Sequence, residues 1–123
     1  MINPDLKEGR KKCSEMLADI DTLSDQLCHV QNHFGFDGWL VNIENELSLE
    51  EVTKMLEFVK LLRQKCHRVI WYDAVTVEGE LKWQNGLTEK NRAFFDAAGV
   101  LFTNYTFKGF FLFFSHFKKY YKI

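Results

Sequence analysis

The stretch FDGWLVNIEN, residues 36–45, decides the fold, because it opens with apolar and glycine residues, continues as a β-type segment and ends in amides and carboxylates. Side chains alternate between the two faces of a strand, so Asn42 and Glu44 are expected on one face and Val41 on the other. Two residues along a strand span roughly 6.5 Å, which suits the holding of one small polar ligand at two points. The alternative interpretation is a buried strand whose polar end is a turn into the next helix.

Helices are predicted on both sides of this stretch. Apolar residues recur at three- and four-residue steps from about residue 10 to residue 33, the acidic residues at 19–25 indicate a break, and Gly35 is a stop signal. After the stretch, Ser48 and Glu51 form a capping box that begins a helix of about four turns. The apolar stripe of this helix consists of Leu49, Val52, Met55, Leu56, Val59 and Leu62.

Two further strands follow. Residues 68–73 are β-branched and aromatic, which is typical of a strand, and residues 74–86 are a loop that contains Trp83. Thr88 is the expected cap of a short helix that ends at residue 98. The third strand is predicted over residues 100–103.

The order of these elements predicts an α/β fold with parallel strands. Three strands, about thirty residues apart, alternate with helices, and this pattern implies right-handed helical crossovers. Parallel strands end at one edge of the sheet, where α/β folds bind their ligands. Glu44, Tyr72, Asp73, Asn104 and Tyr105 are therefore expected to gather at the carboxyl edge.

Composition narrows the class of protein. The 123 residues allow one domain, and 16 basic and 17 acidic residues are mixed without the basic stripe that nucleic-acid binding needs. No secretory signal is visible, and no apolar run approaches the ~20 residues of a membrane span. Cys13, Cys28 and Cys66 form no Cys-x-x-Cys pair, which favours small buried thiols in a reducing compartment and a soluble cytosolic protein.

The expected rim lacks a glycine-rich phosphate loop and a nucleophile elbow, so a doubly wound nucleotide-binding domain is a weak alternative. His29 and His33 have metal-ligand spacing but no further partner at this edge, so no metal is expected. Carboxylates with aromatic walls are typical of sugar-processing sites. Most glycosidases use two carboxylates, whereas Glu44 is paired here with Asn42. An amide suits substrate assistance, in which an acetamido group of N-acetylglucosamine attacks its own anomeric carbon and Glu44 is the lone acid/base.

Five blocks of the sequence carry a specific resemblance. They are FDGWLVNIEN (36–45), VIWYDAVT (69–76), LKWQ (81–84), NRAFFD (91–96) and FTNY (102–105). In order and spacing, over roughly residues 8–107, they resemble cytosolic endo-β-N-acetylglucosaminidases of glycoside hydrolase family 85. The resemblance implies a TIM (β/α)8-barrel catalytic domain that needs no cofactor. It also implies cleavage between the two core N-acetylglucosamines of N-glycans and of N-glycosylated peptides or proteins.

The resemblance also implies roles for individual residues. Asn42 would orient and stabilise the oxazoline-forming acetamido group, Glu44 would be the acid/base, and Tyr72 matches the active-site tyrosine of the family. Trp83 matches the loop tryptophan, and Phe107 stands where the family usually has another aromatic residue. The expected substrate contacts are Trp71, Asp73, Trp83, Asn104, Tyr105 and Phe107.

The chain departs from the family in two respects. A barrel of eight strands takes about 250 residues, and this chain has room for three strands. We therefore expect residues 1–107 to be a partial barrel domain, weakly active or inactive alone, with a catalytically dead glycan-binding or interaction fragment as the alternative. Residues 108–123 are a divergent aromatic and basic tail. The tail is interpreted either as an alternative or mis-spliced end without a function, or as a segment that lies on a membrane surface.

Overall fold

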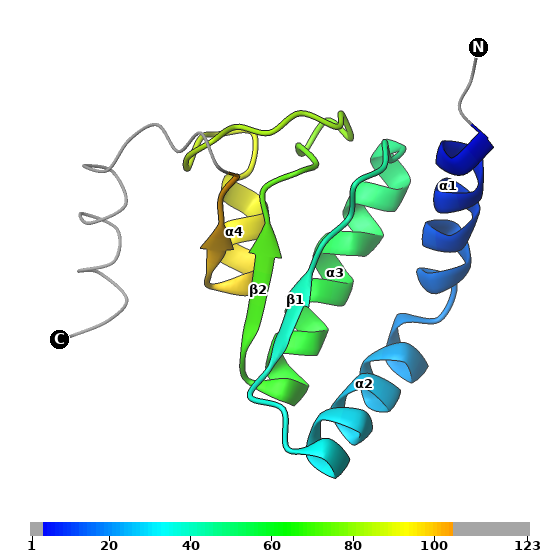
Figure 1. Cartoon of the computed structure of the whole chain (residues 1–123), viewed down its shortest axis with the longest axis vertical. Coiled ribbons are helices and arrows are strands. Elements are labelled where there is room, and N and C mark those ends of the chain that lie inside the picture. The colour runs from blue at the N-terminus through cyan, green and yellow to red at the C-terminus, as the bar shows by residue number, and fades with distance from the viewer. Residues whose placement is uncertain (1–3, 105–123) are drawn as a thin grey trace, which may run out of the picture.

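A three-stranded parallel sheet lies at the centre of the computed structural model, which describes residues 4–104 (Figure 1). In chain order the elements are α1 (Pro4–Met16), α2 (Ile20–Phe34), β1 (Trp39–Val41), α3 (Leu49–Cys66), β2 (Val69–Tyr72), α4 (Arg92–Ala98) and β3 (Leu101–Phe102). The alternation of strands and helices confirms the predicted α/β class.

The strand order is β1-β2-β3, and both pairings are parallel, as predicted. Val41 of β1 is in register with Trp71 of β2, and Tyr72 of β2 is in register with Phe102 of β3. All three strands therefore end at the same edge, called here the carboxyl edge. Within residues 4–104 the sheet is open rather than closed, so the structure is compatible with part of a barrel but contains no complete barrel.

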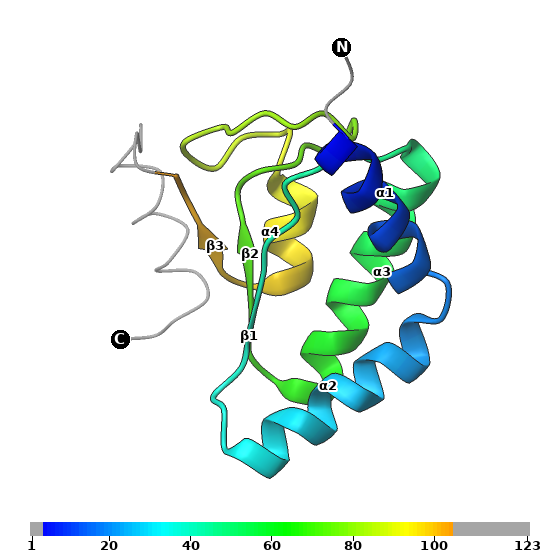
Figure 2. The same ribbon diagram turned by 45° about the vertical axis from the view of Figure 1, so that its right-hand side comes forward.

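The helices lie on one side of the sheet. Figure 2 shows the strands to the left of α3 and α4, and α2 packs against α3 as a further layer. The opposite side of the sheet, called here the open face, carries Leu40 and Phe102, which are 49% and 54% exposed. Within residues 4–104 no helix covers this face.

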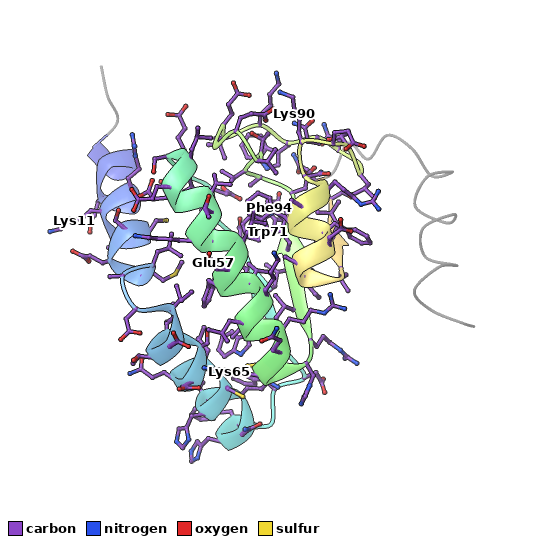
Figure 3. All side chains as sticks on the ribbon, turned by 180° about the vertical axis from the view of Figure 1, so that it is seen from behind. Lys11, Glu57, Lys65, Trp71, Lys90 and Phe94 are labelled. Atoms are coloured by element: carbon purple, nitrogen blue, oxygen red, sulfur yellow. The ribbon has the colours of Figure 1, made fainter. Side chains whose placement is uncertain are left out.

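The hydrophobic core lies between the sheet and α3 and α4. Trp71 of β2 and Phe94 of α4 are fully buried and stack with ring centroids 4.1 Å apart and planes 3° from parallel (Figure 3). Burial of two large rings in one contact stabilises the sheet against α4. The α3 side of the core is formed by Val52, Met55, Phe58, Val59, Leu62 and Cys66.

The capping box predicted for α3 is confirmed. The Glu51 amide donates to Ser48 Oγ at 3.2 Å, and the Ser48 amide donates to Glu51 Oε2 at 2.7 Å. The Ser14 hydroxyl of α1 also donates to Glu51 Oε1 at 2.7 Å, so the same carboxylate joins α1 to the start of α3. Leu49 is 68% exposed, so its predicted place in the apolar stripe was wrong.

Several predicted boundaries need correction. The break between α1 and α2 lies at residues 17–19 and overlaps the predicted range, 19–25, only at Asp19, which caps α2 by accepting from the Thr22 amide at 3.0 Å. Gly35 ends α2 in a left-handed conformation, as predicted. The short helix predicted after Thr88 is α4, which begins at Arg92 because residues 88–91 form a turn.

Three further observations concern the described residues. Cys13 and Cys66 are buried, as predicted, whereas Cys28 is partly exposed, and all three are free thiols. No helix between residues 4 and 104 is long and apolar enough to cross a membrane. The predicted tail, residues 108–123, lies outside the described residues, and so does the end of the predicted domain.

Candidate active site

Asn42 and Glu44 lie just beyond β1, at the carboxyl edge. The Asn42 amide nitrogen donates to Glu44 Oε1 at 3.2 Å, and both side chains are exposed. Ile43 between them is 9% exposed and belongs to the core. The alternation of faces predicted for residues 42–44 is therefore confirmed, although β1 itself ends at Val41.

Tyr72 and Phe102 continue this row across the sheet. Because Val41 pairs with Trp71, Asn42 stands beside Tyr72 at the next position along the two strands. Tyr72 pairs in turn with Phe102, and their ring centroids are 6.0 Å apart. Asn42, Tyr72 and Phe102 therefore form a row on the open face, with Glu44 one step further along the chain.

Phe102 is a candidate that the sequence reasoning missed. It is the last residue of β3 and is 54% exposed beside Tyr72. The signal was present, because Leu101 is buried and alternation then turns Phe102 toward the open face. Its exposure supplies an aromatic surface at the rim.

The placement of Trp71 and Asp73 corrects their predicted role as substrate contacts. Trp71 is fully buried against Phe94, and Asp73 is 1% exposed. Alternation along β2 turns both side chains away from the open face, whereas Tyr72 between them is turned toward it. Their surroundings are those of residues that support the structure from inside.

The segment 74–91, called here the Trp83 loop, arches over the carboxyl edge of the sheet (Figure 1). Its tryptophan is 36% exposed. Backbone hydrogen bonds fold the loop on itself: the Lys82 amide donates to the Ala74 carbonyl at 2.8 Å, and the Val77 amide donates to the Lys90 carbonyl at 2.8 Å. The loop is therefore an ordered structure and not an open coil.

Gly79 joins the Trp83 loop to the segment that follows Glu44. Its carbonyl accepts from the Leu47 amide at 2.9 Å, and its φ of 82° is in the left-handed region. A Cβ at this position would collide with the Leu47 carbonyl oxygen. Glycine is needed here for both reasons, and the contact fixes the loop relative to the rim.

The other residues considered from the sequence lie in different parts of the chain. Asn104 is partly exposed two residues beyond Phe102, and Tyr105 and Phe107 lie outside the described residues. His29 and His33 are exposed on α2, away from the carboxyl edge. Among the described residues, no group of three His, Cys, Asp or Glu side chains could hold a metal ion.

Comparison with known proteins places the chain in a family of carbohydrate-cleaving enzymes. The model of glycosyl hydrolase family 85 matches residues 2–115. This match covers most of the sequence, and the chain belongs to glycosyl hydrolase family 85.

The chain is also similar to individual curated proteins. Cytosolic endo-beta-N-acetylglucosaminidase 2 of Arabidopsis thaliana is 44% identical over 110 residues, which cover 82% of this chain and 16% of the relative. Cytosolic endo-beta-N-acetylglucosaminidase of Homo sapiens is 41% identical over 111 residues (82% of this chain, 15% of the relative). The protein of the same name in Danio rerio is 44% identical over 107 residues (80% and 15%). The chain thus spans about a sixth of the length of these relatives.

Proposed function

We propose that this chain carries the catalytic pair of a cytosolic endo-β-N-acetylglucosaminidase. The bond cleaved would lie between the two core N-acetylglucosamines of free or protein-linked N-glycans. The observation that carries the proposal is the direct hydrogen bond of the Asn42 amide to the Glu44 carboxylate, with both side chains exposed at the carboxyl edge. Membership of the family and the names of the relatives support it, since those names give both the activity and the cytosol.

In the first step, the acetamido oxygen of the sugar attacks its own anomeric carbon while the bond to the leaving sugar breaks. Glu44 donates a proton to the departing glycosidic oxygen. Asn42 binds the acetamido group and holds it in the geometry for attack. The product of this step is a protonated oxazoline, which keeps the amide hydrogen on its nitrogen and is formed without a bond to the protein.

In the second step, water adds to the anomeric carbon of the protonated oxazoline, and the bond from this carbon to the oxazoline ring oxygen breaks, which restores the acetamido group. Glu44, now a carboxylate, takes a proton from this water, as microscopic reversibility requires. Two displacements at one carbon give retention of configuration. One carboxylate is then sufficient, because the substrate supplies its own nucleophile.

Aromatic side chains around the pair suit the binding of pyranose rings. Tyr72 and Phe102 lie in the same row as Asn42, and Trp83 is exposed on the loop above the edge. Flat apolar faces stack on sugar rings, while the Tyr72 hydroxyl can hydrogen bond to a sugar oxygen. Asn104 is proposed as a further polar contact at this edge.

The test is hydrolysis of a glycopeptide that carries a chitobiose core, followed by mass spectrometry of the products. We would measure it for the 123-residue chain, and for a chimera in which residues 4–104 replace the matching segment of the Arabidopsis relative. Glu44→Gln in the chimera is expected to lower turnover by roughly a hundredfold or more. Glu57→Gln, an exposed change on α3, is the matched control. Turnover by Glu44→Gln at the rate of the unchanged chimera would contradict the proposal.

A second candidate is a glycan-binding fragment without catalytic activity. The observation that favours it is the open sheet: within residues 4–104 three strands are present and the outer edges of β1 and β3 have no partner strand. A cleft built by eight strands would then lack walls, and we expect weak or absent turnover by this chain alone. Binding of the glycopeptide without cleavage, together with an active chimera, would favour this candidate.

A further inference from the structure

Asp73 is buried at the base of the Trp83 loop, and the three hydrogen-bond partners of its carboxylate are all donors. Its Oδ2 accepts from the backbone amides of Gln84 at 2.9 Å and Asn85 at 2.8 Å. Its Oδ1 accepts from the Asn91 side-chain amide at 2.9 Å. An ionised carboxylate is an acceptor at both oxygens, so it satisfies all three donors at once.

The two backbone partners follow Trp83 directly in the chain. Asn85 has a φ of 58°, a left-handed conformation that residues other than glycine seldom adopt. Adjacent amides that converge on one oxygen define the turn through Trp83, Gln84 and Asn85. The position of the Trp83 backbone therefore depends on the Asp73 carboxylate. Gln84, the first residue that donates to this carboxylate, is eleven positions after Asp73 in the chain.

Asn91 completes the network from the other end of the loop. Its side-chain amide also donates to the Gly86 carbonyl at 2.8 Å, and its Oδ1 accepts from the Thr88 amide at 2.8 Å. Asn91 is fully buried. Through this residue Asp73 also fixes the return of the chain into α4.

We propose that Asp73 is the positioning residue of the Trp83 loop: it acts through the backbone amides of Gln84 and Asn85 to hold the Trp83 backbone in the loop over the carboxyl edge. The use of Trp83 as a sugar-stacking surface rests on the function proposed above. A loop held in place before the ligand arrives loses less conformational freedom on binding. Asp73 thereby contributes to glycan affinity without touching the glycan.

The test uses the full 123-residue chain and compares Asp73→Asn with Asn91→Ala. Asparagine has nearly the shape of aspartate, but it replaces one acceptor oxygen by a donor, so it cannot satisfy all three donors. Asn91→Ala removes the same Asp73–Asn91 hydrogen bond while leaving Gln84 and Asn85 their acceptor. A comparison of the two variants therefore separates the effect of losing the acceptor of the Gln84 and Asn85 amides from the effect of a general disturbance of the core.

The first readout is amide hydrogen exchange at Gln84 and Asn85. Asp73→Asn is expected to accelerate their exchange by about tenfold or more, relative to Lys82, whereas Asn91→Ala leaves the ratio near that of the unchanged chain. The second readout is acrylamide quenching of Trp83 in a Trp39→Phe background, because Trp71 is fully buried. Quenching is expected to rise in Asp73→Asn. Asp96→Asn, a change at an exposed residue of α4, should alter neither readout.

Equal acceleration in both variants, or unchanged protection in Asp73→Asn, would overturn the proposal. If Asp73→Asn does not fold, the unchanged chain still decides, because Gln84 and Asn85 must then be protected to the degree of Lys82. Exchange of these amides at the rate of an unstructured loop would overturn the role of Asp73. No glycan enters these measurements, so a failure of the proposed function would show separately, in the chimera, as glycopeptide turnover that Glu44→Gln does not lower.

Discussion

The Asn42 side-chain amide donates a hydrogen bond to the Glu44 carboxylate at 3.2 Å, while the side chain of Ile43 between them is buried in the core. This relationship follows from strand alternation continued beyond the end of β1. Within residues 4–104, this hydrogen bond uses one side-chain hydrogen of Asn42, so the second Nδ2 hydrogen and the side-chain Oδ1 are available to a ligand.

Asn42→Ala in the chimera is expected to reduce turnover of the glycopeptide by roughly a hundredfold, because the acetamido group would lose the group that orients it. The loss should fall mainly on kcat, since orientation acts on the step that forms the oxazoline. Asn32→Ala, a change at an exposed residue of α2, is the control. An Asn42→Ala chimera with the kcat of the unchanged chimera would exclude this role.

Replacement of Trp71 by alanine should mainly lower the stability of the fold, whereas replacement of Trp83 should mainly weaken glycopeptide binding. Trp71→Ala removes a fully buried ring stacked on Phe94 and is expected to lower the free energy of unfolding by about 3–5 kcal/mol. Trp83→Ala removes a 36% exposed ring, with a smaller expected loss of about 0.5–1 kcal/mol but weaker glycopeptide binding. Urea denaturation and glycopeptide titration measure the two effects. A stable Trp71→Ala variant that had lost glycan binding would instead support Trp71 as a substrate contact.

The capping box predicts acid sensitivity at the start of α3. The Ser48 backbone amide, and then the Ser14 hydroxyl, hold the pKa of Glu51 below its ordinary range. A carboxylate with a lowered folded-state pKa stabilises the fold above the unfolded-state pKa, and this contribution declines as the pH falls through the folded-state pKa. The stability difference between the unchanged chain and Glu51→Gln should therefore be larger near pH ~7 than near pH ~3. Glu57→Gln serves as the exposed control, and a difference that grows in acid would contradict the interpretation.

Gly79 and Gly35 offer a matched pair. Both have a positive φ, but a Cβ on Gly35 would meet no atom, whereas one on Gly79 would meet the Leu47 carbonyl. Gly35→Ala should cost about 1 kcal/mol of unfolding free energy, which is the backbone penalty alone. Gly79→Ala should cost at least ~1 kcal/mol more, because the loop must also move. Equal losses in urea denaturation would show that the close approach contributes nothing.

Much of the fold could be predicted because it follows from local signals. The α3 capping box, the Gly35 stop and the alternation of helices and strands along the chain depend on residues near one another in sequence, and the structure confirms them. Parallel pairing followed from the thirty-residue spacing alone. The same alternation rule placed Asn42 and Glu44 on one face, where the structure joins them by a hydrogen bond.

The remainder depends on contacts that a local pattern does not encode. Asp73 follows the last residue of β2 at the carboxyl edge, as predicted, but the packing of α3 and α4 decides that the face of β2 with Trp71 and Asp73 is covered. The sequence predicts Asn91 as part of a helix, whereas in the structure its side-chain amide donates a hydrogen bond to Asp73, eighteen residues away. The sequence predicts Phe102 only as a residue of the third strand. Its exposure could not be predicted, because it depends on the absence of a covering layer within residues 4–104.

Cys28 and Cys66 meet where α2 packs on the end of α3. The Cys28 thiol donates to the Lys65 carbonyl at 3.3 Å, and Cys66 is 2% exposed. Burial, together with a hydrogen bond between the Cys66 thiol and Cys28, raises the pKa of Cys66 to about 12. Because the thiolate is the nucleophile, iodoacetamide at about pH 8 should alkylate Cys28 at least roughly a hundredfold faster than Cys66.

Burial likewise raises the pKa of Cys13, which is 7% exposed, so Cys13 should also react slowly in the folded chain. Peptide mass spectrometry over a time course gives all three rates in one sample, and the same reaction in concentrated urea is the control, where the three rates should converge. Convergence in urea with a slow Cys66 in buffer would show that the α2–α3 contact protects the thiol. Equal rates for Cys28 and Cys66 without denaturant would mean that the end of α3 opens faster than alkylation occurs, and that this packing contributes little to the stability of the fold.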